Sequence, residues 1–519
     1  QLFESELMPT TWQTFPIEFR GGLVSNLSPL QQGINKVGSA TILQNYEPAR
    51  EGGYRKILGY TKFSSTAVTG SGAILGVKLL NAGEIITARS NGTDTEYYIG
   101  TGTTWTSLGA AADLGGRISS EEFNFGNIHK VAFVDGVNYP AVYNDTTNTL
   151  SFLTGAPAEV HGAKYIKAFK NHIFYAKGTM LSFSAPYNEA DFTVAAGAGV
   201  VDIGHTITGL AVFRDILVVF ARNKVLQLVG NTIADFNLQP ITEDIGCVSG
   251  DTIQEIGGDI MYLAPDGLRL LSATDRNDDF ALEIASAPIE KDARIVTDSS
   301  TTYSSMVIRG KAQYRLFAYI SSDSASNHRG LLATKFSDQG SSRIEWATLR
   351  GIKVYSVDSK YSESGESVYF GNDDGYIYTM DNGSSFDGAN IESVYESPYM
   401  PITDPQLRKT LYRMTLYVTP TGNFNIQCGI KYDFNRINNT PVIQPPVFSI
   451  VSTGGGVPIY GTPGLVWGSF NYGGELDRVY SNHLIGSGKT FAIRFDDKTT
   501  NPSHTLDAAI IEFMPLDRQ

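Results

Sequence analysis

The sequence contains little cysteine, little tryptophan and little charge. Among its 519 residues there are two cysteines, four tryptophans and 18% charged residues. Cys247 and Cys428 lie far apart in the chain and fit no metal-binding or redox spacing, and two cysteines cannot form the disulfide framework of a small secreted domain. We therefore expect two free thiols that pack as small buried hydrophobes, in a chain that is made in a reducing cytoplasm.

Long apolar runs are absent as well. No run of about 18 apolar residues occurs, and the first residues lack the basic-then-apolar pattern of a signal peptide. The sequence thus predicts no membrane-spanning segment. Helical periodicity is also scarce: only 287–296 predicts a short helix, and 1–63 is expected to be extended.

The motifs that usually carry catalysis or bind metals are missing. The seven histidines are scattered, without an HxH or HExxH arrangement for zinc, and no GxSxG nucleophile elbow occurs. GSGKT at 486–490 resembles the end of a phosphate-binding loop, but the earlier glycine of that motif is replaced by His483 and 491–495 has strand character. We expect a hairpin turn there, and no catalytic, cofactor-binding or metal-binding residues.

Acidic doublets are the remaining candidates for a carboxylate pair or a calcium loop. The candidate doublets are Glu243–Asp244, Asp278–Asp279, Asp373–Asp374 and Asp496–Asp497. Adjacent residues of a strand point to opposite faces, so a doublet cannot be the catalytic pair of a glycosidase. Each doublet lies near a predicted turn, where aspartate caps the backbone. In VYFGNDDGYIYTMDNG (368–383) no glutamate follows to close a calcium loop, and Asp374-Gly375 predicts a hairpin with a type I′ turn.

Glycine and aromatic residues are abundant, with 53 glycines, 27 tyrosines and 27 phenylalanines. Glycine-rich turns between aromatic and β-branched runs indicate an all-β protein. One phrase recurs: a β run, a glycine-containing turn and an aromatic β run, with copies that start at 84, 130, 172, 216, 259, 314 and 368. A period of about 40–50 residues with several strands per unit is typical of a β-propeller, and six or seven blades fit.

The chain is predicted to have three parts. Residues 1–63 form an extended N-terminal segment that is expected to pack on a platform, 64–385 form the propeller, and 386–519 form a C-terminal β-sandwich or platform. Clean strands such as KTLYRMTLYVTP and KTFAIRFDD support the sandwich. The platform also carries a Pro/Gly-rich insertion at 438–466, which is unusually long for a loop in a compact domain.

The insertion is the candidate functional segment. Its prolines stiffen two arms, its glycines supply a flexible tip, and its apolar residues can dock. The candidate gate or docking residues are Pro445, Pro446, Val447, Phe448, Gly454, Gly455 and Gly456. Three interpretations stay open: a gate that projects into a lumen and holds DNA, a seat for a tail appendage, or an ordinary hairpin that packs only on its own domain.

Several ordered phrases resemble the tail tubular proteins (tail nozzle and tail hub) of short-tailed bacteriophages, the podoviruses. FRGGLVSNLSP (19–29) and NYEPAREGGYRKILGYTKF (45–63) are similar to the N-terminal entry of those proteins. SFSAPYNEADF (182–192), the stretch 207–274 and VYFGNDDGYIYTMDNGSSFDGANI (368–391) are similar to their propeller, and WGSFNYGGELDRVYSNHLIGSGKTFAIRF (467–495) to their C-terminal part. The resemblance runs in order across most of the chain.

The resemblance implies a structural virion protein without enzymatic activity. It implies a homohexameric ring below the tail adaptor (the head-to-tail connector), which extends the portal conduit, retains the packaged genome and passes it during ejection. The expected partners are the adaptor, tail fibres or spikes, and viral double-stranded DNA that moves through the lumen without sequence-specific binding. The protein would be assembled in the host cytoplasm and located in the phage tail. The alternative is a propeller that acts as a carbohydrate-active enzyme or lectin.

The net charge of −13 argues against a protein that grips nucleic acid, because such binding uses lysine and arginine to neutralise phosphates. It does not exclude a protein that DNA must slide past. In a ring of many copies, an acidic wall would repel phosphate and ease passage. The charge can equally serve only to keep the subunit in solution, and both interpretations stay open.

Overall fold

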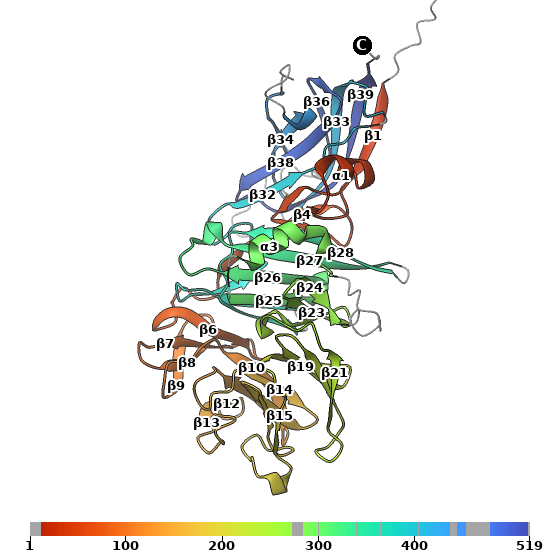
Figure 1. Cartoon of the computed structure of the whole chain (residues 1–519). Coiled ribbons are helices and arrows are strands. Elements are labelled where there is room, and N and C mark those ends of the chain that lie inside the picture. Colours follow the sequence, from red (N-terminus) through yellow and green to blue (C-terminus); the bar gives the residue numbers. More distant parts are fainter. Residues whose placement is uncertain are drawn as a thin grey trace, which may run out of the picture. The chain divides into compact units, whose positions relative to one another are not determined.

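The computed structural model describes residues 12–271, 284–298, 300, 302–338, 341–362, 365–402, 404–435, 444–452 and 478–516. Strands predominate (Figure 1), which confirms the predicted all-β class. By their contacts the residues form two units: a propeller unit, 61–331 and 352–380, and a sandwich unit, 1–60, 332–351 and 381–519. The predicted parts began at 64 and 386, whereas these units change at 61 and 381, and 332–351 goes with the sandwich unit.

Four sheets of the propeller unit each contain four strands in chain order. They are β6 (Ser71–Leu79), β7 (Ile85–Ser90), β8 (Thr95–Gly100) and β9 (Trp105–Ala110); β10 (Ser119–Phe125), β11 (Ile128–Val134), β12 (Ala141–Asn144) and β13 (Thr149–Phe152); β14 (Tyr165–Phe169), β15 (His172–Lys177), β16 (Met180–Phe183) and β17 (Gly199–Asp202); and β18 (Ile207–Phe213), β19 (Ile216–Ala221), β20 (Val225–Val229) and β21 (Asn237–Thr242).

Two further sheets complete the six-bladed propeller. One contains β22 (Gln254–Ile256), β23 (Asp259–Ala264) and β24 (Gly267–Leu270). The other contains β29 (Ser356–Ser362), β30 (Gly365–Gly371), β31 (Ile377–Met380) and β5 (Tyr60–Lys62). Because β5 precedes the first blade in the sequence, the last blade is completed by a strand from the start of the propeller. In the same unit, β25 (Thr302–Ile308) and β26 (Gln313–Tyr319) form a further antiparallel pair.

The recurring phrase predicted the blades because it forms the middle hairpin of each. Its copies at 84, 130, 172, 216, 259 and 368 become the pairs β7–β8, β11–β12, β15–β16, β19–β20, β23–β24 and β30–β31. The copy at 314 falls on β26 and β27 (Arg329–Asp338).

Buried apolar side chains join the blades in sequence. Each cluster draws on two successive sheets; one, for example, combines Phe123 and Val134 of the second blade with Ile173 of the third. The cluster that closes the ring places Ile377 of the last blade among Ile74 and Tyr98 of the first. The hydrophobic core of this unit is therefore divided among the blade interfaces, as the alternation of the strands requires.

The hairpin at 368–383 is confirmed, but its predicted turn type is wrong. Gly371 pairs with Ile377, so five residues connect the strands. Gly375 has φ +85°, whereas a type I′ turn needs positive φ at both central residues. Asp374 does not have a positive φ, and its Oδ1 accepts the Tyr376 N–H at 2.8 Å. This carboxylate organises the longer loop.

The sandwich unit contains strands from both ends of the chain, which confirms the predicted platform. One sheet has the order β3 (Tyr46–Pro48), β4 (Tyr54–Lys56), β39 (His504–Pro515), β33 (Lys409–Pro420) and β36 (Val479–His483), with β1 (Gln13–Glu18) beside β39 and β37 (Ser487–Gly488) beside β33. The second runs β28 (Ser341–Arg350), β2 (Ile42–Gln44), β32 (Ile391–Glu396), β38 (Phe491–Thr499), β34 (Asn425–Tyr432) and β35 (Phe448–Val451).

Helices are few. The predicted helix at 287–296 is confirmed as the 3-10 turn η3 (Ala287–Ile289) followed by α3 (Glu290–Thr297). The prediction that 1–63 is entirely extended is wrong, because α1 spans Pro29–Asn35. The Ser28 hydroxyl accepts the Gln31 N–H at the start of α1, and Pro29 occupies the first turn. The remaining 3-10 turns are η1 (Val194–Ala196), η2 (Gly250–Thr252), η4 (Arg309–Lys311), η5 (Ala325–Asn327) and η6 (Asp433–Asn435).

A buried ion pair joins the two sheets of the sandwich. Lys56 Nζ on β4 lies 2.9 Å from Asp497 Oδ2 on β38, and the two side chains are 1% and 0% exposed. The ammonium also donates to the carbonyls of Thr499 and Asn501, and the other carboxylate oxygen accepts the Thr499 N–H and hydroxyl. These hydrogen bonds are needed, because burying a charge without partners costs a large amount of free energy.

His504 lies against this ion pair and stays neutral. Burial, with the nearby Lys56 ammonium, lowers the pKa of His504 to about 3. Its Nε2 lies 2.9 Å from the Tyr46 hydroxyl. A neutral imidazole that accepts from Tyr46 keeps its proton on Nδ1, which faces Asp497 at 3.7 Å.

We expect Lys56→Met to destabilise the sandwich unit by about 3–5 kcal/mol, because it leaves Asp497 buried and unpaired. Lys56→Met combined with Asp497→Leu should recover most of that loss, since neither charge is then buried alone. The measurement is the thermal unfolding of both variants. Arg20→Met is the control, because its ion pair with Glu18 is exposed (72% and 69%) and should change stability little. Equal losses in the single and double variants would contradict this role of the pair.

Candidate functional site

The candidate gate or docking residues are only partly described. Pro445, Pro446 and Val447 lead into β35, and Phe448 begins it, paired with Cys428 of β34. Gly454, Gly455 and Gly456 lie outside the described residues. The gate and docking interpretations therefore stay predictions.

The described part of this segment presents apolar side chains to solvent. β35 ends the order of its sheet in the described part of the chain. Val447 is 61% exposed and Val451 is 48% exposed, while Ile450 between them is buried. This alternation is that of a half-buried strand, so one face of β35 packs on its own sheet and the other presents valines.

The acidic doublets do not form catalytic pairs. Asp373 Oδ2 accepts from Lys353 Nζ at 2.5 Å and from the Tyr319 hydroxyl at 3.2 Å, and Asp374 caps its own loop. Glu243 pairs with Lys224 at 3.1 Å. Asp278 and Asp279 lie outside the described residues.

The prediction that every doublet lies near a turn is wrong for Asp496–Asp497, which lies inside β38. The two carboxylates point to opposite faces, as strand geometry requires. Asp497 is buried with Lys56, and Asp496 lies 2.7 Å from Arg494 Nε. Both are therefore structural residues.

The other sequence candidates also have structural positions. The predicted hairpin turn at GSGKT is wrong: β37 pairs with β33, whereas β38 belongs to the other sheet, so this segment connects the two sheets. Asp433 Oδ1 accepts the N–H groups of Lys489 and Thr490 there, at 2.8 and 2.9 Å. Cys247 and Cys428 are free and buried, and burial raises the pKa of Cys247 to about 12. Within the described ranges, no group of three or more His, Cys, Asp or Glu side chains could hold a metal ion. No helix among these residues has the length and apolar character to span a membrane.

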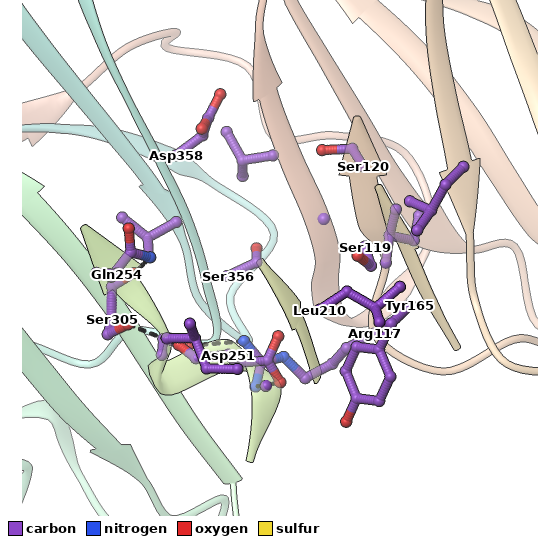
Figure 2. Close-up of a pocket in the computed structure, with 18 of the residues that line it drawn as sticks. Arg117, Ser119, Ser120, Tyr165, Leu210, Asp251, Gln254, Ser305, Ser356 and Asp358 are labelled. Atoms are coloured by element: carbon purple, nitrogen blue, oxygen red, sulfur yellow. Dashed lines mark hydrogen bonds and ion pairs between the residues drawn. The ribbon is translucent and has the colours of Figure 1, made fainter. Parts of the chain in front are cut away.

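The sequence analysis missed a polar cavity at the centre of the propeller. It has a volume of about 180 Å³. Figure 2 shows its side chains, with Arg117 and Asp251 side by side and Asp358 at a distance from them. The cavity is lined by residues from the first strands of the six blades and from β25; among them are Arg117, Ser119, Ser120, Tyr165, Leu210, Asp251, Gln254, Ser305, Ser356 and Asp358.

Arg117 reaches from the start of β10 to residues of η2 and β25. Its guanidinium lies 3.2 Å from the Asp251 carboxylate and donates to the Ser304 hydroxyl at 2.9 Å and to the Tyr303 carbonyl. It also lies 5.4 Å from the centre of the Tyr355 ring, a cation–π contact. These contacts fix one wall of the cavity, yet the buried Arg117 Nε has no hydrogen-bond partner in the described structure.

Glu122 anchors a second polar cluster beside the cavity. Its carboxylate on β10 lies 3.0 Å from Lys78 Nζ on β6 and 2.8 Å from Lys360 Nζ on β29, and His129 Nε2 is 3.2 Å away. Lys78 also lies 3.4 Å from Asp358. Burial alone would raise the pKa of Glu122, but the two ammonium groups outweigh it and lower the pKa to about 2. Oppositely charged side chains thus link the inner strands β6, β10 and β29.

The two cavity carboxylates are both engaged. Asp251 faces Arg117, and Asp358 accepts the Leu79 N–H at 2.9 Å and faces Lys78. Each carboxylate therefore serves as a partner of a cation or of a backbone N–H in the wall of the cavity.

Comparison with known proteins finds some similar solved structures but no family. No family model and no curated protein matches the chain. Solved structures that match include the extracellular domain of a sensor described as a one-component system from B. thetaiotaomicron (9% identity, TM-score 0.38, 69% of this chain and 43% of that one). An exo-β-1,3-galactanase from Phanerochaete chrysosporium with galactose (11%, 0.26, 88% and 100%) and BBS1N in complex with ARL6DN (10%, 0.39, 63% and 97%) also match.

These similarities are low. The chain spans less than half of the first two matching structures (43% and 44%). At such TM-scores the matches carry no argument about function, and the propeller assignment rests on the strand topology of this chain itself.

We expect Glu122→Gln to lower stability by about 2 kcal/mol at pH 7, because the depressed pKa measures how strongly the folded state favours the ionised carboxylate. That stabilisation is complete above the ordinary pKa of 4.5. It is lost as pH falls toward about 2, so the difference from wild type should shrink between pH 5 and about 3. Thermal unfolding at several pH values measures it. Glu255→Gln, on an exposed residue of β22, is the control, and a difference that stays constant with pH would contradict the cluster.

Proposed function

We propose that this chain is a structural subunit of a bacteriophage tail, which forms a ring-shaped tail nozzle or hub. In this function the ring, a homohexamer, extends the conduit below the adaptor, retains the packaged genome and passes double-stranded DNA during ejection. The subunit also offers a site for tail fibres or spikes. It belongs to the virion and has no enzymatic activity.

The observation that supports this proposal most is the ordered resemblance and where its phrases lie in the fold. NYEPAREGGYRKILGYTKF covers β3, β4 and β5, so it supplies two strands of the sandwich and the strand that completes the last blade. VYFGNDDGYIYTMDNG supplies the middle hairpin of that same blade. These two phrases thus lie in segments through which the units are closed, and such segments are essential to the architecture.

The chemistry of the described residues is compatible with this proposal. The charged side chains at the propeller centre are paired with one another, and the acidic doublets that are described serve turns or ion pairs. A carbohydrate-active enzyme would instead need two carboxylates poised on either side of a sugar. A propeller that acts as a carbohydrate-active enzyme or lectin is the alternative, and the next experiment distinguishes it.

We expect the purified chain, alone or mixed with the tail adaptor, to form rings of about six copies, because head-to-tail contacts that close do so at a fixed number. Native mass spectrometry and electron microscopy of the mixture measure this. A chain that stays monomeric with adaptor and cleaves or retains glycans would overturn the proposal in favour of the alternative.

A pair of matched variants tests the candidate segment in the same assembly. Val451→Lys places a charge on the exposed face of β35 (48% exposed), and Val200→Lys places one on β17 at equal exposure (49%). If β35 takes part in a gate or an appendage seat, only Val451→Lys should release genome from particles or lose the appendage, because an edge charge prevents docking. Particles that are normal with both variants would leave only the ordinary hairpin.

A further inference from the structure

We propose that the central cavity of the propeller binds one small, neutral polyhydroxy molecule of about the size of a single sugar ring. This inference concerns a site within one propeller and does not depend on ring assembly. It rests on the volume of the cavity, on the unpartnered Nε of Arg117 and the serine hydroxyls there, and on the balance of its charges.

The volume limits the class of ligand. The cavity has a volume of about 180 Å³. Pockets for drug-sized ligands usually have about 300–1,000 Å³, so a nucleotide or the body of an oligosaccharide would not fit. A single sugar ring or a comparable polyol would.

Polar groups in the cavity need partners. The buried Nε of Arg117 has no hydrogen-bond partner among the described residues, and the partly buried side chains of Ser119 and Ser120 line the same cavity. By contrast, the hydroxyls of Ser305 and Ser356 donate to backbone carbonyls at 2.7 and 2.8 Å. Buried polar groups are nearly always satisfied, so Arg117 Nε calls for an acceptor, and the Ser119 and Ser120 hydroxyls can exchange hydrogen bonds with the same molecule.

The charges favour a neutral molecule. Three charged side chains that line the cavity and their partners are Arg117 with Asp251, Asp358 with Lys78, and Lys167 with Glu121. An additional anion or cation would compete with these pairs and would remain partly uncompensated. A hydroxyl both donates and accepts, so it can serve the serines and the guanidinium alike. Tyr165 and Leu210 line the same region (Figure 2) and offer apolar surface to the C–H groups of a sugar ring.

Titration of the full chain with D-galactose, D-glucose and D-mannose, followed by saturation-transfer NMR and calorimetry, tests the proposal. We expect saturable binding of at least one sugar. Ser120→Val should weaken that binding about tenfold, because it removes one hydrogen bond to the ligand. Ser151→Val, which changes a serine on the outer strand β13, should leave the affinity unchanged.

The other outcomes are equally clear. If no sugar gives a saturable signal at millimolar concentrations, the cavity holds only water and the proposal is overturned. If Ser120→Val and Ser151→Val bind equally well, the sugar lies elsewhere on the chain. Thermal unfolding of both variants establishes that they are folded. A disaccharide with equal affinity would identify the end of a glycan as the source, and binding of the monosaccharide alone would identify the free sugar. Ring formation is unaffected in either case, so this test is separate from that of the proposed function.

Discussion

The sandwich depends on one buried ion pair between residues that are 441 positions apart, Lys56 and Asp497. Neither charge can be hydrated, so each is tolerated only while the other is in place. The pair therefore fixes β4 against β38, and it cannot form until the start of the chain and its C-terminal part have met. All of the propeller sequence lies between these two residues, so the closure of the sandwich imposes a large loop on the folding chain.

Closure of the propeller also requires contacts between segments that are far apart in the sequence. Its last blade takes β5 from before the first blade, and Ile377 packs against residues of the first blade. Around the axis, however, contacts are polar: Glu122 holds two lysines from neighbouring strands, and Arg117 spans to η2 and β25. Apolar packing thus joins each blade to the next, while ion pairs link the inner strands around the propeller axis.

Sequence reasoning predicted the propeller well because its signal is local and repeated. Each phrase contains two strands and their turn, so the pattern reports the middle hairpin of a blade directly. The inner strands lie outside the phrase. One of them, β10, has the sequence SSEEFNF, which is polar because part of it lines the cavity, and this polar run was the signal in the sequence that could have indicated the cavity.

Asp497 was assigned to a turn because a sequence does not show that Lys56 lies opposite it. The helix α1 was missed although Ser28-Pro29 is a sound start signal, because Gly33 and Gln32, both buried, obscure its apolar face. The strands at 332–351 continue the β pattern of the propeller, and only contacts reveal that they belong to the sandwich unit.

The central claim is that this chain is a structural part of a phage tail. The most direct measurement is immuno-electron microscopy of phage particles, with an antibody that binds the purified propeller unit in its folded state. The account predicts label at the tail, in a ring below the adaptor, and none on the capsid. Particles without label, under conditions in which the antibody binds the isolated chain, would contradict it.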